Sequence, residues 1–145
     1  MPILVVCTRA FLSQTSFGVS AIVADGEGRV LIGRSRLAGG WTLPGGGVDA
    51  FEPPEKAVIR ELEEEVGLQA SAPPELIGLY TRRVLWATNM IAVYCVREAR
   101  LAFKPSFEIS EIRWIDPANP PEGTHPGTMR RLAEFAGLRP RGPYW

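Results

Sequence analysis

The stretch of residues 46–68, GGVDAFEPPEKAVIRELEEEVGL, constrains the fold of this chain more than any other. It opens with glycines, passes through Pro53 and Pro54, and reaches Gly67 near its end. Proline suits the first turn of a helix, where a backbone N–H would lack a partner, and glycine suits the residue just past a helix end. These residues therefore predict a short helix between the prolines and Gly67.

The predicted helix has two distinct faces. Its apolar residues gather on a side that a core can bury, and they are Val58, Ile59, Leu62 and Val66. Glu61, Glu64 and Glu65 share another face, whereas Glu63 falls outside it. Carboxylates this close together repel one another unless a cation lies among them, and hard oxygen ligands suit Mg²⁺ or Mn²⁺. A solvated acidic face is the alternative that the glutamates alone would favour.

The spacing of the flanking residues favours the metal-binding interpretation. Five residues separate Gly46 from Glu52, seven separate Glu52 from Arg60, and the run RELEEEVGL follows. This pattern resembles the signature of the Nudix hydrolase family at every defined position, and the preceding WTLPG resembles its usual lead-in. Phe51 is a local departure, because relatives often place a glycine there, and it predicts a stiffer or differently shaped loop.

The resemblance implies a fold and a reaction. The fold is α+β, an α/β/α sandwich around a central mixed sheet, and the unequal mixture of strands and helices independently favours α+β. The reaction is divalent-metal-dependent hydrolysis of a pyrophosphate bond in a nucleoside diphosphate linked to another group. A catalytically silent Nudix-fold module that senses a nucleotide is the alternative. Such modules usually lack some glutamates of the signature, whereas this chain has all of them.

The resemblance also assigns roles to particular residues, with Mg²⁺ or Mn²⁺ as the implied cofactor. Glu61, Glu64 and Glu65 become metal ligands, and Glu64 or Glu61 is also a candidate base. Gly45 would offer a backbone carbonyl to a metal.

Two further residues support the implied metal site. Arg60 would orient the glutamates by a salt bridge from within the helix. Glu52 would lie near the metal cluster, either as a further ligand through water or as a structural partner.

Arginines and aromatic residues outside this stretch are candidates for substrate binding. Arg34 and Arg36 precede it on a predicted loop, and a guanidinium matches the geometry of phosphate. Trp86, Tyr94 and Phe17 could stack a nucleobase, with packing in the core as the alternative for each. The single histidine, His125, lies at the start of the last predicted helix and suggests a surface or helix-end role.

The substrate is less constrained than the reaction. In the family, ADP-ribose hydrolases often carry a proline beyond the signature, and dinucleoside-polyphosphate hydrolases carry a tyrosine. The corresponding window, residues 83–86, contains neither. Nucleotide sugars such as ADP-ribose and free (d)NTPs remain as competing substrate classes.

The chain as a whole has the size and composition of one soluble domain. It has 145 residues and a formal net charge of zero, which predicts neither a nucleic-acid nor a membrane partner. Cys7 and Cys95 give no disulfide framework, which favours a reducing environment and predicts a cytoplasmic location. The family allows a homodimer, and residues 3–7 could form an edge strand or a segment exchanged with a second subunit.

Apolar runs and turn residues predict the remaining elements. Strands are expected at 17–25, 29–34, 41–43, 75–86 and 89–97 and within 107–116, with a linker at 69–74 and a helix from 126 or 127 to 135. The two long strands are expected to pair across Ala87 and Thr88.

Overall fold

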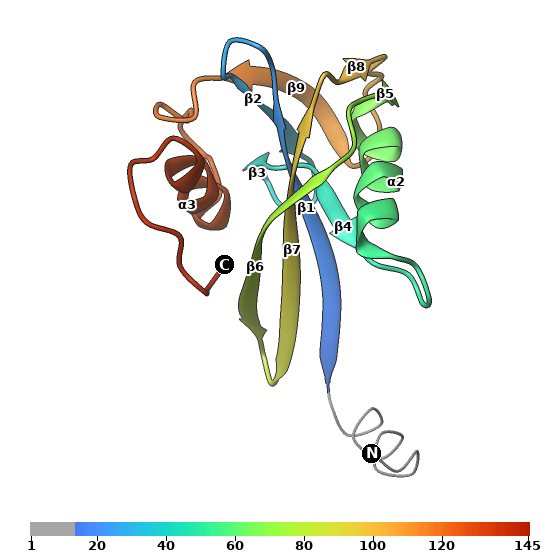
Figure 1. The fold of residues 1–145 in the computed structure, drawn as a ribbon, viewed down its shortest axis with the longest axis vertical. Coiled ribbons are helices and arrows are strands. Elements are labelled where there is room, and N and C mark those ends of the chain that lie inside the picture. The colour runs from blue at the N-terminus through green and yellow to red at the C-terminus, as the bar shows by residue number, and fades with distance from the viewer. Residues whose placement is uncertain (1–13) are drawn as a thin grey trace.

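The computed structural model describes residues 14–145. These residues form three layers, with a sheet between helix α2 (Pro54–Val66) and helix α3 (Pro126–Phe135), as Figure 1 shows. The strands are β1 (Thr15–Ala24), β2 (Val30–Ser35), β3 (Gly40–Thr42), β4 (Gly45–Gly47), β5 (Leu68–Ala70), β6 (Glu75–Val84), β7 (Ala87–Arg97), β8 (Arg100–Leu101) and β9 (Ile109–Ile115). The two long strands, two helices and the strand before α3 that the sequence predicts are all present.

The main sheet is mixed, which confirms the predicted α+β class. Within the described residues it has seven strands in the order β3-β2-β1-β7-β6, with β4 beside β1 and β9 beside β2. Strands β1 and β7 run parallel from the pair Thr15 and Thr88 to the pair Ala24 and Arg97. The other pairs of this sheet are antiparallel.

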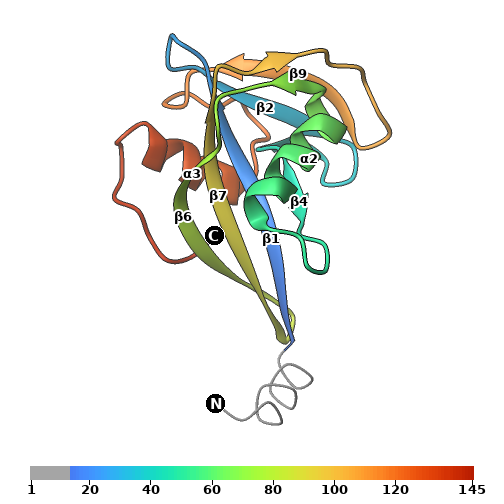
Figure 2. The ribbon, with the colours of Figure 1, turned by 45° about the vertical axis from the view of Figure 1, so that its right-hand side comes forward.

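Each face of the sheet packs on one helix, and Figure 2 shows α2 and α3 on opposite sides of β1 and β7. Alternate residues of β7 divide between the faces, since neighbouring strand residues point in opposite directions. Ala92, Tyr94 and Val96 pack in the cluster that contains α2, and Ile91 and Val93 in the cluster that contains α3. Strand β7 is thus buried on both faces, as predicted for a central strand.

Helix α2 begins and ends where the prolines and Gly67 predict. Pro53 is extended and precedes the first turn, and Gly67 is left-handed with φ 71°. The N–H of Gly67 donates to the carbonyl of Leu62, and a Cβ at Gly67 would lie 2.3 Å from the carbonyl oxygen of Ala102. Glycine is therefore required there by both conformation and space.

The turn between the two long strands lies two residues earlier than predicted. Strand β6 ends at Val84, and Leu85 and Trp86 make the turn, with Leu85 at φ 55°. Thr88 belongs to β7 because it pairs with Thr15. The prediction of a turn at Ala87 and Thr88 was wrong because the parallel partner strand, which the local sequence does not reveal, extends the ladder.

The predicted linker at 69–74 is partly ordered as a strand. Strand β5 pairs with β8 in a separate two-stranded sheet, through the pairs Leu68 with Leu101 and Ala70 with Arg100. This small sheet follows the end of α2 directly. The N–H of Ala102 also donates to the carbonyl of Gly67 at 2.8 Å, which fixes the helix end against the second half of the chain.

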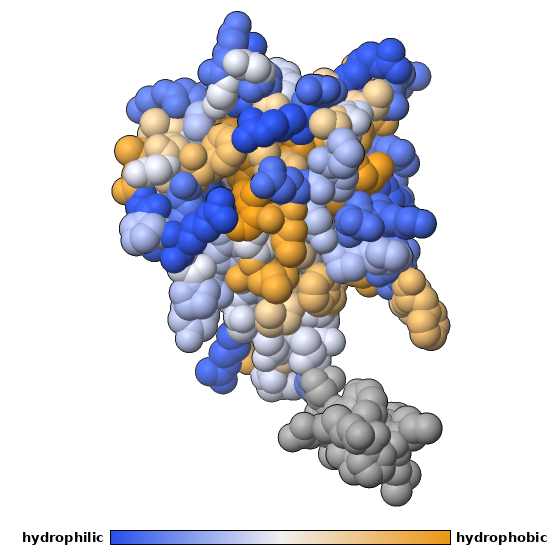
Figure 3. All heavy atoms as spheres, viewed as in Figure 1, coloured by the Kyte–Doolittle hydropathy of each residue, from blue (hydrophilic) through white to orange (hydrophobic). Residues whose placement is uncertain are grey.

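Several large apolar side chains remain exposed on the sheet between the two helices, including Phe17, Leu76 and Leu79. Figure 3 shows apolar surface over these strands in the middle of the view.

The expected segment at 3–7, and Cys7, lie outside the described residues, and the homodimer stays a prediction. Cys95 is a free, buried thiol. Neither α2 nor α3, in the part of the chain described, has the length and hydropathy needed to cross a bilayer.

Candidate active site

Arg60 connects the loop before α2 to the carboxylates of the helix. Its Nε and Nη2 donate to the two carboxyl oxygens of Glu52 at 2.8 and 2.9 Å, and Nη2 also donates to the carbonyl of Gly47 at 2.9 Å. Its Nη1 donates to Glu61 at 2.8 Å and lies 3.5 Å from a carboxyl oxygen of Glu64. One guanidinium thus contacts the loop and two of the predicted ligands.

Glu52 lies beside the acidic helix with both oxygens bonded to Arg60. Its Oε2 also accepts a hydrogen bond from the N–H of Asp49 at 3.0 Å. The hydrogen bonds from Arg60 are the main reason that the pKa of Glu52 is lowered to about 2. In this structure Glu52 is a structural partner of Arg60, and its alternative role as a water-bridged ligand stays a prediction.

Glu61 and Glu65 contact the glycines of strand β4. The N–H of Gly45 donates to Oε2 of Glu65 at 2.9 Å. A Cβ at Gly46 would lie 2.5 Å from the carboxyl carbon of Glu61, and one at Gly45 would lie 2.2 Å from the carbonyl oxygen of Val19. The glycines therefore let β4 fit between β1 and the carboxylates of α2. The predicted metal contact through the Gly45 carbonyl stays a prediction.

The carboxylates of α2 carry negative charge that the protein compensates only in part. Burial, with the charges of Glu61, Glu108 and Glu64 adding to it, raises the pKa of Glu65 to about 7 against the Gly45 hydrogen bond, which lowers it. Burial likewise raises the pKa of Glu61, although Arg60 opposes this. A raised carboxyl pKa means that the ionised form is disfavoured, which a cation would relieve.

Glu108 is an acidic neighbour of this site that the sequence analysis did not identify. It precedes β9, and its charge contributes to the raised pKa of both Glu61 and Glu65. Arg36 holds its loop, since the Arg36 N–H donates to the carbonyl of Glu108 at 2.8 Å and its Nε to the carbonyl of Ser106 at 3.2 Å. A lone glutamate far along the chain carries no local signal, so only the fold reveals it.

The donor set fits a hard divalent cation. Within residues 14–145 no three Asp, Glu, His or Cys side chains gather closely enough to enclose a metal ion. Mg²⁺, however, commonly binds through one or two carboxylates and keeps its remaining positions for water and substrate phosphates. Glu61 and Glu65, with Glu64 exposed beside them, offer oxygen ligands of this kind.

The raised pKa of Glu65 predicts how the metal-free protein responds to pH. Between the ordinary value of 4.5 and about 7, the folded state holds a proton that the unfolded state has released, so stability falls as pH rises through this window. We expect the Tm in EDTA to be roughly 3 to 8 °C higher at pH 5 than at pH 7.5. In Glu65→Gln this difference should shrink clearly in a thermal melt, and an unchanged slope would contradict the assignment.

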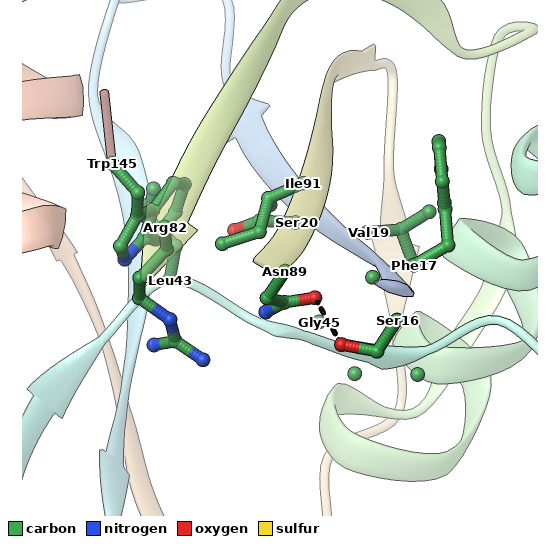
Figure 4. A pocket seen from close by; sticks show the side chains of 13 residues that line it. Ser16, Phe17, Val19, Ser20, Leu43, Gly45, Arg82, Asn89, Ile91 and Trp145 are labelled. Atoms are coloured by element: carbon green, nitrogen blue, oxygen red, sulfur yellow. Dashed lines mark hydrogen bonds between the residues drawn. The ribbon is translucent and has the colours of Figure 1, made fainter. Parts of the chain in front are cut away.

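A cleft lies beside strand β4, with a volume of about 390 Å³. Figure 4 shows its lining, which comes from β1, β4, β6, β7, from Leu43 just before β4, and from the end of the described chain. The residues are Ser16, Phe17, Gly18, Val19, Ser20, Leu43, Gly45, Gly46, Gly47, Arg82, Asn89, Ile91 and Trp145. Since β4 also contacts Glu61 and Glu65, the cleft and the carboxylates share one strand.

The predicted substrate-binding residues, apart from Phe17, lie away from this lining. Tyr94 is buried in the core cluster that contains α2, so the packing alternative holds for it. Trp86 is 76% exposed at the tip of the hairpin. Arg34 lies in β2 with its guanidinium 5.9 Å from the Trp41 ring, and Arg36 supports the loop of Glu108. Phosphate contacts by the two arginines stay a prediction.

Two further sequence expectations have a structural counterpart. Phe51, which stands where relatives often have glycine, is exposed and left-handed with φ 64°, a conformation that costs a bulky residue free energy. His125 precedes α3, with its Nε2 3.1 Å from the carbonyl oxygen of Ala38, so it has the helix-end position predicted for it.

Comparison with known proteins agrees with this geometry. A family model described as "NUDIX domain" matches residues 15–135. An RNA pyrophosphohydrolase from Gluconacetobacter diazotrophicus is 48% identical over 58 residues, which are 34% of this chain and 35% of that protein. The alignment with this relative therefore spans about a third of its length.

Two longer matches cover most of the chain. A MutT-like protein from Streptomyces ambofaciens is 29% identical over 124 residues, covering 86% of this chain and 73% of that protein. The crystal structure of a MutT NUDIX hydrolase from Burkholderia pseudomallei superposes with a TM-score of 0.73 at 27% identity, covering 83% of this chain and 97% of the other.

Proposed function

Since the chain belongs to the NUDIX domain family, we propose that it is a pyrophosphohydrolase that uses Mg²⁺ or Mn²⁺ to cleave a phosphoanhydride bond in a nucleotide-type substrate. The family and the fold predicted from the sequence are confirmed. The observation that supports the activity is geometric: buried Glu61 and partly buried Glu65 both contact the glycines of strand β4, which line the cleft.

The residues of α2 divide the chemical work in this proposal. A divalent cation bound by Glu61, Glu65 and Glu64 would neutralise phosphate oxygens and make phosphorus more electrophilic. Arg60 keeps Glu61 in place while its other contacts hold the loop. A water oxygen forms the new bond to phosphorus, the bridging P–O bond breaks, and its electron pair leaves with the second phosphate-bearing product.

Glu64 is our choice for the base that accepts the proton of the attacking water. Its side chain is 61% exposed, and its nearest cation, Nη1 of Arg60, is 3.5 Å away. Glu61, the other predicted candidate, instead accepts a 2.8 Å hydrogen bond from the same nitrogen. An exposed carboxylate is better placed to meet the attacking water than one that already accepts a short hydrogen bond from Arg60.

The relatives named RNA pyrophosphohydrolase change one expectation from the sequence. The prediction that nucleic acid is not a partner rested on the zero net charge alone. RNA with a phosphoanhydride at one end therefore joins free (d)NTPs and nucleotide sugars among the substrates to test. The cytoplasmic location stays part of the proposal, as the compartment in which such substrates occur.

A substrate panel tests the proposal directly. It contains (d)NTPs, ADP-ribose, other nucleotide sugars and triphosphorylated RNA, each with Mg²⁺, with Mn²⁺ and with EDTA. We expect EDTA-sensitive release of two phosphate-bearing products from at least one class. No release from any class, together with nucleotide binding in calorimetry, would replace the enzyme by the sensing module considered as the alternative.

A further inference from the structure

A row of polar side chains crosses three neighbouring strands at the cleft. Asn89 of β7 pairs with Ser16 of β1 on one side and with Arg82 of β6 on the other. Directly paired residues lie on the same face of a sheet, with their Cβ atoms about 5 Å apart. All three residues line the cleft, and Figure 4 shows them across its floor and margin.

This row presents hydrogen-bond donors to the cleft. The Oδ1 atom of Asn89 accepts a hydrogen bond from the Ser16 hydroxyl at 3.0 Å, while its nitrogen lies on the side of Arg82 (Figure 4). Within residues 14–145 neither this nitrogen nor the Arg82 guanidinium has a partner. An amide nitrogen donates two hydrogen bonds and a guanidinium donates five, and neither accepts any. A ligand that satisfies them must present acceptors.

The other walls of the cleft are apolar and suit a flat apolar group, such as a nucleobase, rather than a phosphate. Leu43, Ile91 and the Trp145 ring line it, and the Trp145 side chain is held edge-on to Tyr80 with the ring centroids 6.1 Å apart. The opposite margin is β4, whose glycines contact Glu61 and Glu65. A nucleotide whose base occupies the cleft therefore has its phosphates next to the carboxylates.

We propose that Asn89 and Arg82 bind the base of the nucleotide substrate and select guanine over adenine. The O6 and N7 atoms of guanine both accept hydrogen bonds, whereas adenine places an N6 donor where guanine has O6. Adenine would therefore leave its own N6 donor facing the donors of the protein. The inference rests on the proposed function for the reaction, but base recognition itself can be measured as binding.

The first test compares dGTP with dATP in the parent protein with Mg²⁺. We expect kcat/KM to be about 10- to 100-fold higher for dGTP, the range of one well-placed bidentate contact. Arg82→Ala should bring the two values close together. Asn89→Asp, which replaces donors by acceptors, should shift the preference toward dATP, and 7-deaza-dGTP, which lacks the N7 acceptor, should lose much of the advantage of dGTP.

Arg83→Ala is the matched control. Arg83 follows Arg82 on β6, its Nε donates to the carbonyl of Leu85, and it lies outside the cleft lining. It should leave the preference unchanged. An equal loss for both nucleotides in Arg82→Ala would mean a phosphate contact and would overturn base selection, as would equal or adenine-favouring turnover by the parent.

Calorimetry with dGMP and dAMP in EDTA separates this inference from the proposed function. Tighter binding of dGMP that Arg82→Ala abolishes, with no hydrolysis of any nucleotide, would uphold guanine selection and reject the enzyme. Metal-dependent hydrolysis with no difference between dGMP and dAMP would uphold the enzyme and reject guanine selection.

Discussion

Glu64→Gln is expected to lower kcat about 100- to 10,000-fold, the usual contribution of a positioned base, while the protein stays folded. The amide keeps the size of the side chain but cannot take a proton from water at neutral pH. Glu64 is exposed, and its ion pair with Arg60 is long at 3.5 Å, so this pair contributes little stability. Its removal also relieves repulsion with Glu61 and Glu65, and the metal-free Tm should therefore stay the same or rise slightly.

Glu63→Gln is the control for this variant. Glu63 is the preceding residue, is exposed, and falls outside the acidic face predicted for α2. It should retain the parent kcat in the same assay on the substrate that the panel identifies. Near-normal turnover by Glu64→Gln would remove Glu64 from the chemistry, and a clear fall in its metal-free Tm would indicate a structural carboxylate.

The sequence predicts the helix of the site closely because its signals are local. Pro53 and Gly67 set the ends of α2, and the 3.6-residue period separates Leu62, which is fully buried, from the glutamates. The contact of Arg60 with Glu64 also follows from positions within one helix, where residues one turn apart are neighbours, whereas its contact with the adjacent Glu61 does not.

The cleft could not be predicted in the same way, because it depends on which strands become neighbours. Strand β7 is apolar on both faces, so its sequence does not reveal that Tyr94 faces α2 while Asn89 faces the cleft. The parallel register with β1 decides this. Arg82 and Trp145 join the cleft through β6 and the return of residues 139–145, for which the sequence holds no pattern.

Helix α3 illustrates a buried charge pair that amphipathic spacing misses. Its apolar spacing highlights Met129, Leu132 and Phe135, yet Met129 is 47% exposed. The side chains of Arg131 and Glu134 are instead only 2% and 3% exposed and form a 2.9 Å ion pair. The i,i+3 spacing allows this pair, but its burial depends on Tyr80 and on residues 142–145, which helical periodicity does not reveal.

We expect Glu134→Ala to lower the free energy of unfolding by about 3 to 5 kcal/mol, because it would leave Arg131 buried without its counter-charge. Glu134 accepts hydrogen bonds from Arg131 at 2.9 Å, from the Tyr80 hydroxyl at 2.7 Å and from the N–H of Gly142 at 3.3 Å. Burial, with the hydrogen bond to Glu134 adding to it, raises the pKa of Tyr80 to about 12. Urea unfolding monitored by tryptophan fluorescence would measure the loss.

Two comparisons decide whether the uncompensated charge is the cause. Glu111→Ala breaks the exposed 3.0 Å pair with Arg113 and should change stability by less than about 1 kcal/mol. Combining Arg131→Met with Glu134→Leu removes both charges and should recover most of the stability lost in Glu134→Ala, since a buried pair is often replaceable by apolar residues of similar volume. If the double variant is as unstable as Glu134→Ala, the loss comes from the other contacts of Glu134, the hydrogen bonds from the Tyr80 hydroxyl and from the Gly142 N–H.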